Sequence, residues 1–265
     1  RTLLTVHILA SGSEGNCLLV SGGGVHLLVD AGISTKRIVT GLEQLGLSPR
    51  DVEGVLVTHE HSDHTAGLAT LTKQYQLPLY ASGGTANALC VRISGAADVV
   101  KVIPRQGTLS FGEMVVTVVP TSHDAAESVD YRFDCGGAAA GVLTDTGFVT
   151  MEAREALSGV GLLVLESNHD EEWLLSGPYP PHLKDRILGP KGHLSNDTAA
   201  CFARMMAMRG TRRFVLAHLS KENNTPEKAL QTAVFALEGL EAEVCVAPRA
   251  EVSGPYTAEV CVCSV

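Results

Sequence analysis

Three of the ten histidines fall within six residues, in the segment VLVTHEHSDHTAGL. Together with one acid, they place four metal-binding side chains on a single short loop: His59, His61, Asp63 and His64. Imidazole nitrogens and carboxylate oxygens suit Zn²⁺, Mn²⁺ and Fe²⁺ alike, whereas a purely structural zinc usually has cysteine ligands. Because a strand-like apolar run ends directly before the loop, we predict a metal site at the C-terminal end of a buried strand.

Further metal ligands are expected from other strand ends, because four residues of one loop rarely close a metal site. His123 follows the apolar run VVTVVP, Asp145 follows GVLT and His218 follows FVLA. Each of them alone is more typical of a capping or hydrogen-bonded residue. Together with the loop they amount to five histidines and two aspartates. Such a set is sufficient for two metal ions that share one carboxylate.

The elements that position these residues are predicted from the hydrophobic pattern. Apolar runs of strand length occur at 3–9, 16–20, 25–30, 54–59, 114–120, 161–166 and 212–218. Helical spacing is found at 38–47, 196–210 and 226–240. Only short turns join the first three strands, and the later strands alternate with helices. The pattern predicts an α/β sandwich of two sheets with helices outside, as a single domain over residues 1–265.

Composition narrows the class of protein further. The chain has 265 residues, of which 45% are hydrophobic, and no apolar run approaches the roughly 20 residues needed to span a bilayer. Residues 1–10 are interpreted as a strand rather than a signal peptide. The seven cysteines are scattered, which favours reduced thiols in the cytoplasm. A net charge of −9 argues against nucleic-acid binding by overall charge alone.

The motif HxHxDH, followed by separated His, Asp and His at strand ends, resembles the metallo-β-lactamase superfamily. SGSEGN, VDAG, LESNHD, GHLSN and LAHLSKENN are similar to its YycJ/WalJ-type branch, and they extend over nearly the whole chain. The resemblance implies an αβ/βα fold, with two packed mixed sheets and a dinuclear metal site at one edge. It implies one cation held by His59, His61 and His123, a second held by Asp63, His64 and His218, and Asp145 bridging them.

Two divalent ions in such a site predict a hydrolase. A water that bridges them ionises near neutrality, far below the bulk pKa of about 15.7, and gives a hydroxide nucleophile. Glu166 and His193 lie outside the metal set, and a carboxylate bonded to an imidazole keeps it protonated for donation to a leaving group. In phosphodiesterase branches of the superfamily a comparable pair assists catalysis. The candidate catalytic residues are therefore Asp63, Glu166 and His193, although His193 could instead only order its loop.

Local charge suggests an anionic substrate. Between residues 182 and 218, seven lysines and arginines stand against two aspartates in an otherwise acidic chain. We predict substrate contacts for Lys184, Arg186, Lys191 and His193, whereas the later arginines are equally typical of a solvated helix. The branch resemblance implies 5′→3′ exonuclease activity on DNA.

Two other functions stay open from the sequence. A small-ester hydrolase, such as a thioesterase or lactonase, would use the same metals but would need no basic segment. A non-catalytic regulatory module with a metal-stabilised fold would hydrolyse nothing. A phosphodiesterase or nuclease with two divalent ions (Zn, Mn or Fe) is favoured, acting on an anionic phosphodiester such as nucleic acid.

Overall fold

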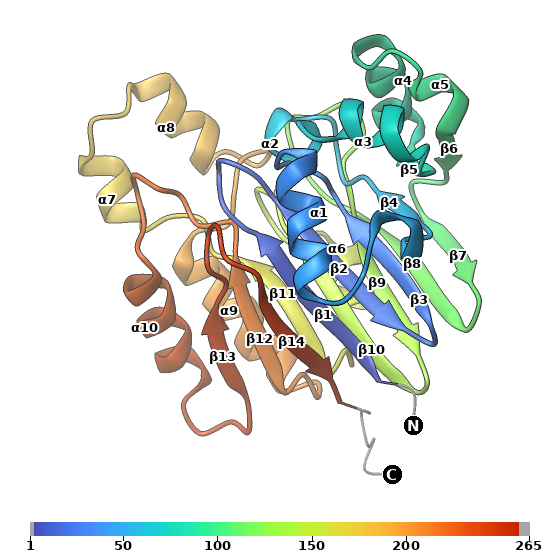
Figure 1. Ribbon diagram of the computed structural model, residues 1–265. Coiled ribbons are helices and arrows are strands. Elements are labelled where there is room, and N and C mark those ends of the chain that lie inside the picture. The colour runs from blue at the N-terminus through green and yellow to red at the C-terminus, as the bar shows by residue number, and fades with distance from the viewer. Residues whose placement is uncertain (1–2, 260–265) are drawn as a thin grey trace.

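Two seven-stranded sheets form the centre of the computed structural model, which describes residues 3–259 (Figure 1). The first sheet has the order β14 (Ser253–Ala258), β1 (Leu4–Ala10), β2 (Cys17–Gly22), β3 (Val25–Val29), β4 (Gly54–Leu56), β5 (Leu79–Ser82) and β6 (Val100–Ile103). The second has the order β13 (Glu243–Val246), β12 (Arg213–Ala217), β11 (Leu162–Glu166), β10 (Ala138–Leu143), β9 (Val129–Cys135), β8 (Met114–Pro120) and β7 (Gly107–Phe111).

Helices cover the outer faces of both sheets. Beside the first sheet lie α1 (Thr35–Gln44), α2 (Ser62–Thr65), α3 (Leu68–Tyr75), α4 (Gly83–Arg92) and α5 (Ala96–Val99). The second sheet is accompanied by α6 (Met151–Ala156), α9 (Asn196–Ala207) and α10 (Pro226–Leu237). In Figure 1, α7 (Glu171–Ser176) and α8 (Pro181–Leu188) project from the body beyond the ends of the strands. The predicted sandwich of two mixed sheets is confirmed.

The chain order of the elements agrees with the sequence pattern in most places. β1, β2 and β3 form antiparallel hairpins, whereas β3 to β6 and β10 to β13 run parallel to their neighbours. Ser195 caps α9 as expected, but this helix ends at Ala207 and α10 ends at Leu237, three residues earlier than predicted in both cases. The ends of the predicted domain, residues 1 and 265, lie outside the described residues.

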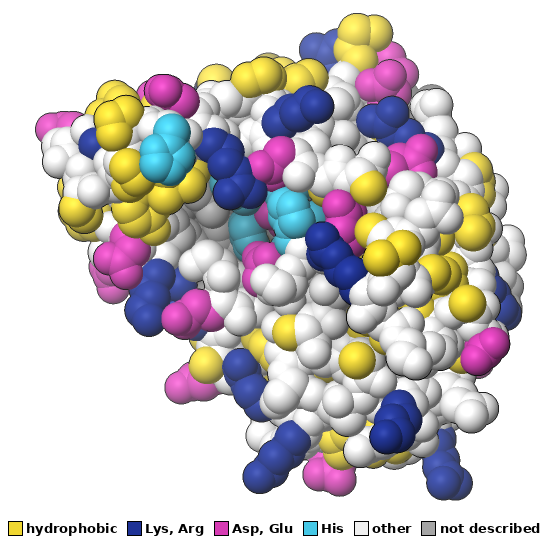
Figure 2. All heavy atoms as spheres, turned by 90° about the horizontal axis from the view of Figure 1, so that it is seen from above, with side chains coloured by type: hydrophobic (Ala, Val, Ile, Leu, Met, Phe, Trp, Pro, Cys, Tyr) yellow, Lys and Arg dark blue, Asp and Glu magenta, His cyan; other side chains and the backbone are white. Residues whose placement is uncertain are grey.

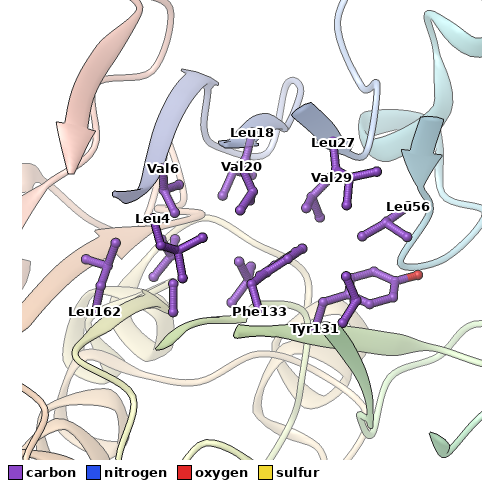
Figure 3. Close-up of a cluster of buried hydrophobic side chains, with 14 of the residues drawn as sticks. Leu4, Val6, Leu18, Val20, Leu27, Val29, Leu56, Tyr131, Phe133 and Leu162 are labelled. Carbon is purple, nitrogen blue, oxygen red and sulfur yellow. The ribbon is translucent and has the colours of Figure 1, made fainter. Parts of the chain in front are cut away.

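The apolar core lies between the two sheets. Figure 3 shows Leu18, Val20, Leu27 and Val29 of the first sheet facing Phe133 of the second, and all five are buried. Alternate residues of β2 and β3 point the other way, under the helices of the outer layer. Strands with both faces covered need continuously apolar sequences, which is why these runs were recognisable.

Other features of the chain follow from composition. No helix within residues 3–259 is both long and apolar enough to cross a membrane. Cys17 and Cys135 are buried, as expected for small thiols, but Cys90 and Cys201 are exposed. Those two cysteines lie on α4 and α9, and the expectation that the scattered cysteines are small buried thiols is wrong for them.

Candidate metal centre

The predicted metal-binding loop follows β4 and continues into the short helix α2. His59 and His64 are buried, and His61 occupies the N-cap position of α2 without a capping hydrogen bond from its side chain. The VDAG motif packs directly against this loop: a Cβ atom on Gly32 would lie 1.6 Å from the backbone oxygen of Asp63. Only glycine permits so close an approach, so this motif sets the position of the loop.

The SGSEGN motif holds the same loop from another side. Asn16 donates its backbone N–H to the oxygen of Asp63 at 2.8 Å, and its Nδ2 lies 3.3 Å from His64 Nε2. Ser11 accepts a 2.8 Å hydrogen bond from the backbone N–H of His218, which is 207 residues further along the chain. The motif therefore connects two parts of the centre that are distant in sequence.

Seven side chains with metal-binding atoms meet at this edge of the sheets. Four groups of side chains have ligand atoms that all lie within 4.8 Å of one another. Two of these groups are His59, His61 and His123, and Asp63, His64 and His218. The other two groups both include Asp145, once with His59 and His64, and once with Glu166, His193 and His218. The first two groups are the two triplets that the resemblance assigns to two cations.

Asp145 lies between the two triplets. Its carboxylate is 3.1 Å from His64 Nε2, 3.6 Å from His123 Nε2 and 3.6 Å from His218 Nε2. Asp145 and His218 both have positive φ angles, of 46° and 56°. Such angles are uncommon outside glycine and concentrate at functional sites, because the surrounding structure must maintain them.

Asp30, which follows β3, orients His64 from behind. His64 Nδ1 lies 2.6 Å from Asp30 Oδ2, and Thr58 donates both its backbone N–H and its hydroxyl to the same carboxylate. Nδ1 is therefore the protonated nitrogen, and His64 Nε2 faces the cluster. From the sequence, Asp30 was recognisable only as part of the VDAG motif, although its place at the end of a buried strand was a signal for this role.

Glu166 connects His218 to His193. The carboxylate is fully buried, and its Oε1 lies 2.8 Å from Nδ1 of each histidine, while its Oε2 accepts the N–H of Leu194. Both imidazoles are thus held through Nδ1, which leaves Nε2 of each for other partners. The structure places the predicted pair Glu166 and His193 in direct contact.

The pKa values of this network reflect buried charge. Burial raises the pKa of Glu166, but the charge and hydrogen bond of His193 and the hydrogen bond of His218 outweigh it and bring the pKa to about 2. Burial lowers the pKa of His218, yet Asp145, Asp63 and Glu166 together raise it to about 10. Burial likewise lowers the pKa of His193, and Glu166 more than reverses this. The carboxylates therefore create a region that stabilises positive charge.

Two polar atoms of the cluster fit a cation better than any protein partner. His59 Nε2 is buried and has no hydrogen-bond partner among residues 3–259, and Asp145 Oδ2 is buried and faces His64 Nε2 at 3.1 Å. Thr58 donates its hydroxyl to Asp30, so it accepts from His59 Nδ1 at 2.9 Å and leaves a lone pair on Nε2. Burial lowers the pKa of His59 well below its usual value, which keeps the ring neutral. Buried atoms of this kind are costly unless a ligand satisfies them.

The cluster opens into a pocket with two different walls. Strand-end residues, including Asp63, Asp145 and His218, form one wall, and Tyr179, Leu183 and other residues on and beside α8 form the opposite one. Figure 2 shows histidine side chains at the bottom of this hollow, with acidic side chains beside them and Lys or Arg side chains at its rim.

The predicted substrate-binding side chains differ in whether other groups of the protein already bind them. Arg186 lines the pocket, but it donates to the carboxylate of Asp124. Lys184 Nζ donates to the backbone oxygens of Leu175 and Gly177, at 2.6 and 2.8 Å. Lys191 is exposed. His193 lines the pocket itself.

The later arginines of the basic segment lie away from the pocket lining. Arg204 donates to the oxygen of Ala236, and Arg209 donates to Ser158. Arg213 pairs with Glu243, and Arg212 lies 3.9 Å from Glu241. Arg204 lies on α9, but Arg213 lies in β12 and Arg212 directly precedes it, so the solvated-helix interpretation is wrong for these two arginines.

Comparison with known proteins agrees with the fold and the cluster. A model of the beta-lactamase superfamily domain matches residues 26–219. The chain belongs to the beta-lactamase superfamily, and the cluster provides the His and Asp set of a divalent-metal site.

Several relatives cover most of the chain. It is 41% identical over 232 residues to exodeoxyribonuclease YycJ of Bacillus anthracis, with 87% of this chain and 88% of the relative covered. It is 38% identical over 255 residues to exodeoxyribonuclease WalJ of Streptococcus pneumoniae, with 95% and 94% covered. This supports the predicted YycJ/WalJ-type branch.

Solved structures share the fold at lower identity. A diphosphatase of the PhnP family has a TM-score of 0.68 at 18% identity, with 98% of this chain and 99% of that chain covered. Human tRNase Z, short form, has a TM-score of 0.64 at 19% identity, with 95% and 99% covered.

Proposed function

We propose that the protein is a metal-dependent phosphodiesterase that degrades DNA as an exonuclease. The observation that carries the proposal is the meeting of two ligand triplets on either side of Asp145, at the bottom of a pocket with cationic groups at its rim. One divalent cation would be held by His59, His61 and His123, and a second by Asp63, His64 and His218. Zinc, manganese and iron all suit this donor set.

When bound, two such ions lower the pKa of a shared water and stabilise charge on a phosphoryl oxygen. The chain itself supplies orientation and a proton. Glu166 keeps His193 protonated and directs its Nε2 into the pocket, where it can protonate the leaving oxygen. Asp63, which lies 3.4 Å from His218 Nε2, completes the second triplet and faces the same space. Glu166 acts as a positioning residue for both histidines.

The preference for DNA is supported by the relatives, whose names describe exodeoxyribonucleases. Arg186 at the pocket and the exposed Lys191 beyond it are suited to phosphate oxygens of a bound strand. The 5′→3′ direction and the cytoplasmic location stay predictions from the sequence. The alternative of a thioesterase or lactonase is not favoured, because the names of these relatives describe exodeoxyribonucleases.

The decisive experiment is hydrolysis of end-labelled DNA by the metal-reconstituted chain. Single- and double-stranded DNA and RNA are compared, each labelled at the 5′ or the 3′ end, with Zn²⁺ or Mn²⁺. We expect release of mononucleotides or short products from DNA, and loss of this activity on addition of a chelator. DNA binding should weaken steeply with salt, whereas binding of a neutral ester would not. If the chain hydrolysed neither DNA nor bis(p-nitrophenyl) phosphate, the non-catalytic regulatory module would be the remaining interpretation.

The matched variant is Asp145→Asn, which removes a charge between the triplets while keeping the shape of the side chain. It should abolish DNA hydrolysis, whereas Asp98→Asn, on an exposed helical residue, should not affect it.

A further inference from the structure

Asp124 is an acidic residue of the pocket. It belongs to neither ligand triplet, and it has no part in the proposed proton transfer. It follows His123 directly and lines the pocket. Its Oδ2 accepts a hydrogen bond from Arg186 on α8. Its Oδ1 is buried and has no hydrogen-bond partner within the described residues 3–259.

The free oxygen of Asp124 points to the first ligand triplet. Oδ1 lies 3.4 Å from His123 Nε2 and 4.0 Å from His61 Nε2. Nδ1 of His123 is occupied by the backbone oxygen of Gly192, at 3.1 Å, so Nε2 is the atom that His123 offers to a cation. Donor atoms at about 2.1 Å from one tetrahedral zinc ion are about 3.4 Å apart. The 3.4 Å between Asp124 Oδ1 and His123 Nε2 equals this separation, and the 4.0 Å between Asp124 Oδ1 and His61 Nε2 is somewhat longer.

An ion pair with Arg186 does not by itself explain this arrangement. The Arg186 side chain is 57% exposed, and exposed ion pairs contribute little to stability. Such a pair would satisfy Oδ2 and leave Oδ1 buried and unsatisfied, which carries a desolvation penalty. A cation next to His61 and His123 would satisfy it.

We propose that Asp124 is an eighth metal-binding residue, whose Oδ1 donates to the cation held by His59, His61 and His123. The inference rests on the proposed metal centre and adds an oxygen donor to its all-histidine triplet. Carboxylate oxygen favours Mn²⁺ more than imidazole does, so Asp124 shifts this position towards manganese. Because Arg186 holds the other oxygen, the same carboxylate also joins α8 to the metal centre.

The proposal is tested by metal binding to the full chain after removal of metal with a chelator. Calorimetric titrations with Mn²⁺ and with Zn²⁺ compare the parent protein with Asp124→Asn and Asp124→Ser. We expect one of the two binding events to weaken by about 10–100-fold, the range found when groups that support a metal site are removed. The other event should stay unchanged, and Mn²⁺ should be affected more than Zn²⁺.

Two control variants separate a metal ligand from an ion-pair partner. Asp185→Asn makes the same charge change at an exposed position of α8 and should leave both affinities unchanged. Arg186→Gln breaks the ion pair but keeps the carboxylate, so Mn²⁺ affinity should stay within a few-fold of the parent value. A loss in Arg186→Gln equal to that in Asp124→Asn would overturn the proposal, because the ion pair would then be what matters.

A spectroscopic readout tests coordination directly. With Co²⁺ in the centre, removal of an oxygen donor lowers the coordination number and strengthens the visible d–d absorption. We expect this change in both Asp124 variants and not in Asp185→Asn. An unchanged cobalt spectrum together with unchanged affinities would exclude Asp124 as a ligand. A parent protein that binds no metal would instead contradict the proposed function, so the two failures are distinguishable.

Discussion

The two walls of the metal pocket are built in different ways. Behind the strand-end wall, Asp30, His64 and Glu166 are almost completely buried, as is His218 in the wall itself. Short hydrogen bonds join Asp30 to His64 and Glu166 to His218. On the opposite wall, α8 has no buried residue. In Figure 2, hydrophobic side chains lie exposed on this projecting part of the surface. The comparison indicates that buried hydrogen bonds fix the positions of the proposed metal-binding side chains. The position of α8, on the wall that would face the substrate, depends on a few exposed contacts. Substitutions on the two walls should differ accordingly.

The largest effect is expected at His193, where the two walls meet. His193→Ala should leave metal content unchanged and reduce turnover of a diester with a poor leaving group by at least ~10²-fold, because the proton donor is lost. A diester with a p-nitrophenolate leaving group, which needs no protonation, should be affected much less. His182→Ala, an exposed histidine on α8, is the matched control. Equal losses on both substrates would remove His193 from proton transfer.

On the strand-end wall, Asp30→Asn should weaken metal binding by about 10–100-fold, because His64 loses the carboxylate that orients it. Titration with Zn²⁺ measures the change. Asp98→Asn, an exposed acid, should bind as the parent protein does. An unaltered affinity in Asp30→Asn would mean that the backbone alone orients His64.

The metal-free protein should lose stability as the pH rises from about 6.5 to about 10, because the pKa of His218 is raised from 6.5 to about 10 on folding. A raised pKa stabilises the fold fully below the unfolded value and ceases to do so above the folded one. The raised pKa values of His64 and His193 act in the same direction. Calorimetry with chelator should show the Tm falling over this range, and bound Zn²⁺ should reduce the fall. A Tm that stays constant over this pH range in the presence of chelator would contradict the prediction.

The smallest effect is expected on the α8 wall. Lys184→Ala removes two hydrogen bonds to the backbone oxygens of Leu175 and Gly177. We expect a loss of about 1 kcal/mol in unfolding free energy, unchanged metal affinity and faster protease cleavage between residues 177 and 190. A large loss of metal would show that the two walls are not independent.

The sequence predicted the strand-end wall far better than the α8 wall. Proposed ligands such as His123 and Asp145 were recognisable because they come shortly after apolar runs, so burial and position could be inferred together. Strand β14 and the groups around α8 lack such a signal. Lys184 binds backbone oxygens, and Arg186 binds Asp124. These contacts depend on how loops distant in the sequence meet, and counting charges along the chain does not reveal that.

The hydrogen bond from His218 to Ser11 has a consequence for how the molecule is made. During synthesis, the residues of the first triplet, His59, His61 and His123, are all translated before Asp145 and His218. The other triplet, and its link to the N-terminal loop, must wait for residue 218 to leave the ribosome. The proposed second cation position, and with it the proposed hydrolytic activity, therefore cannot be complete before residue 218 has been translated.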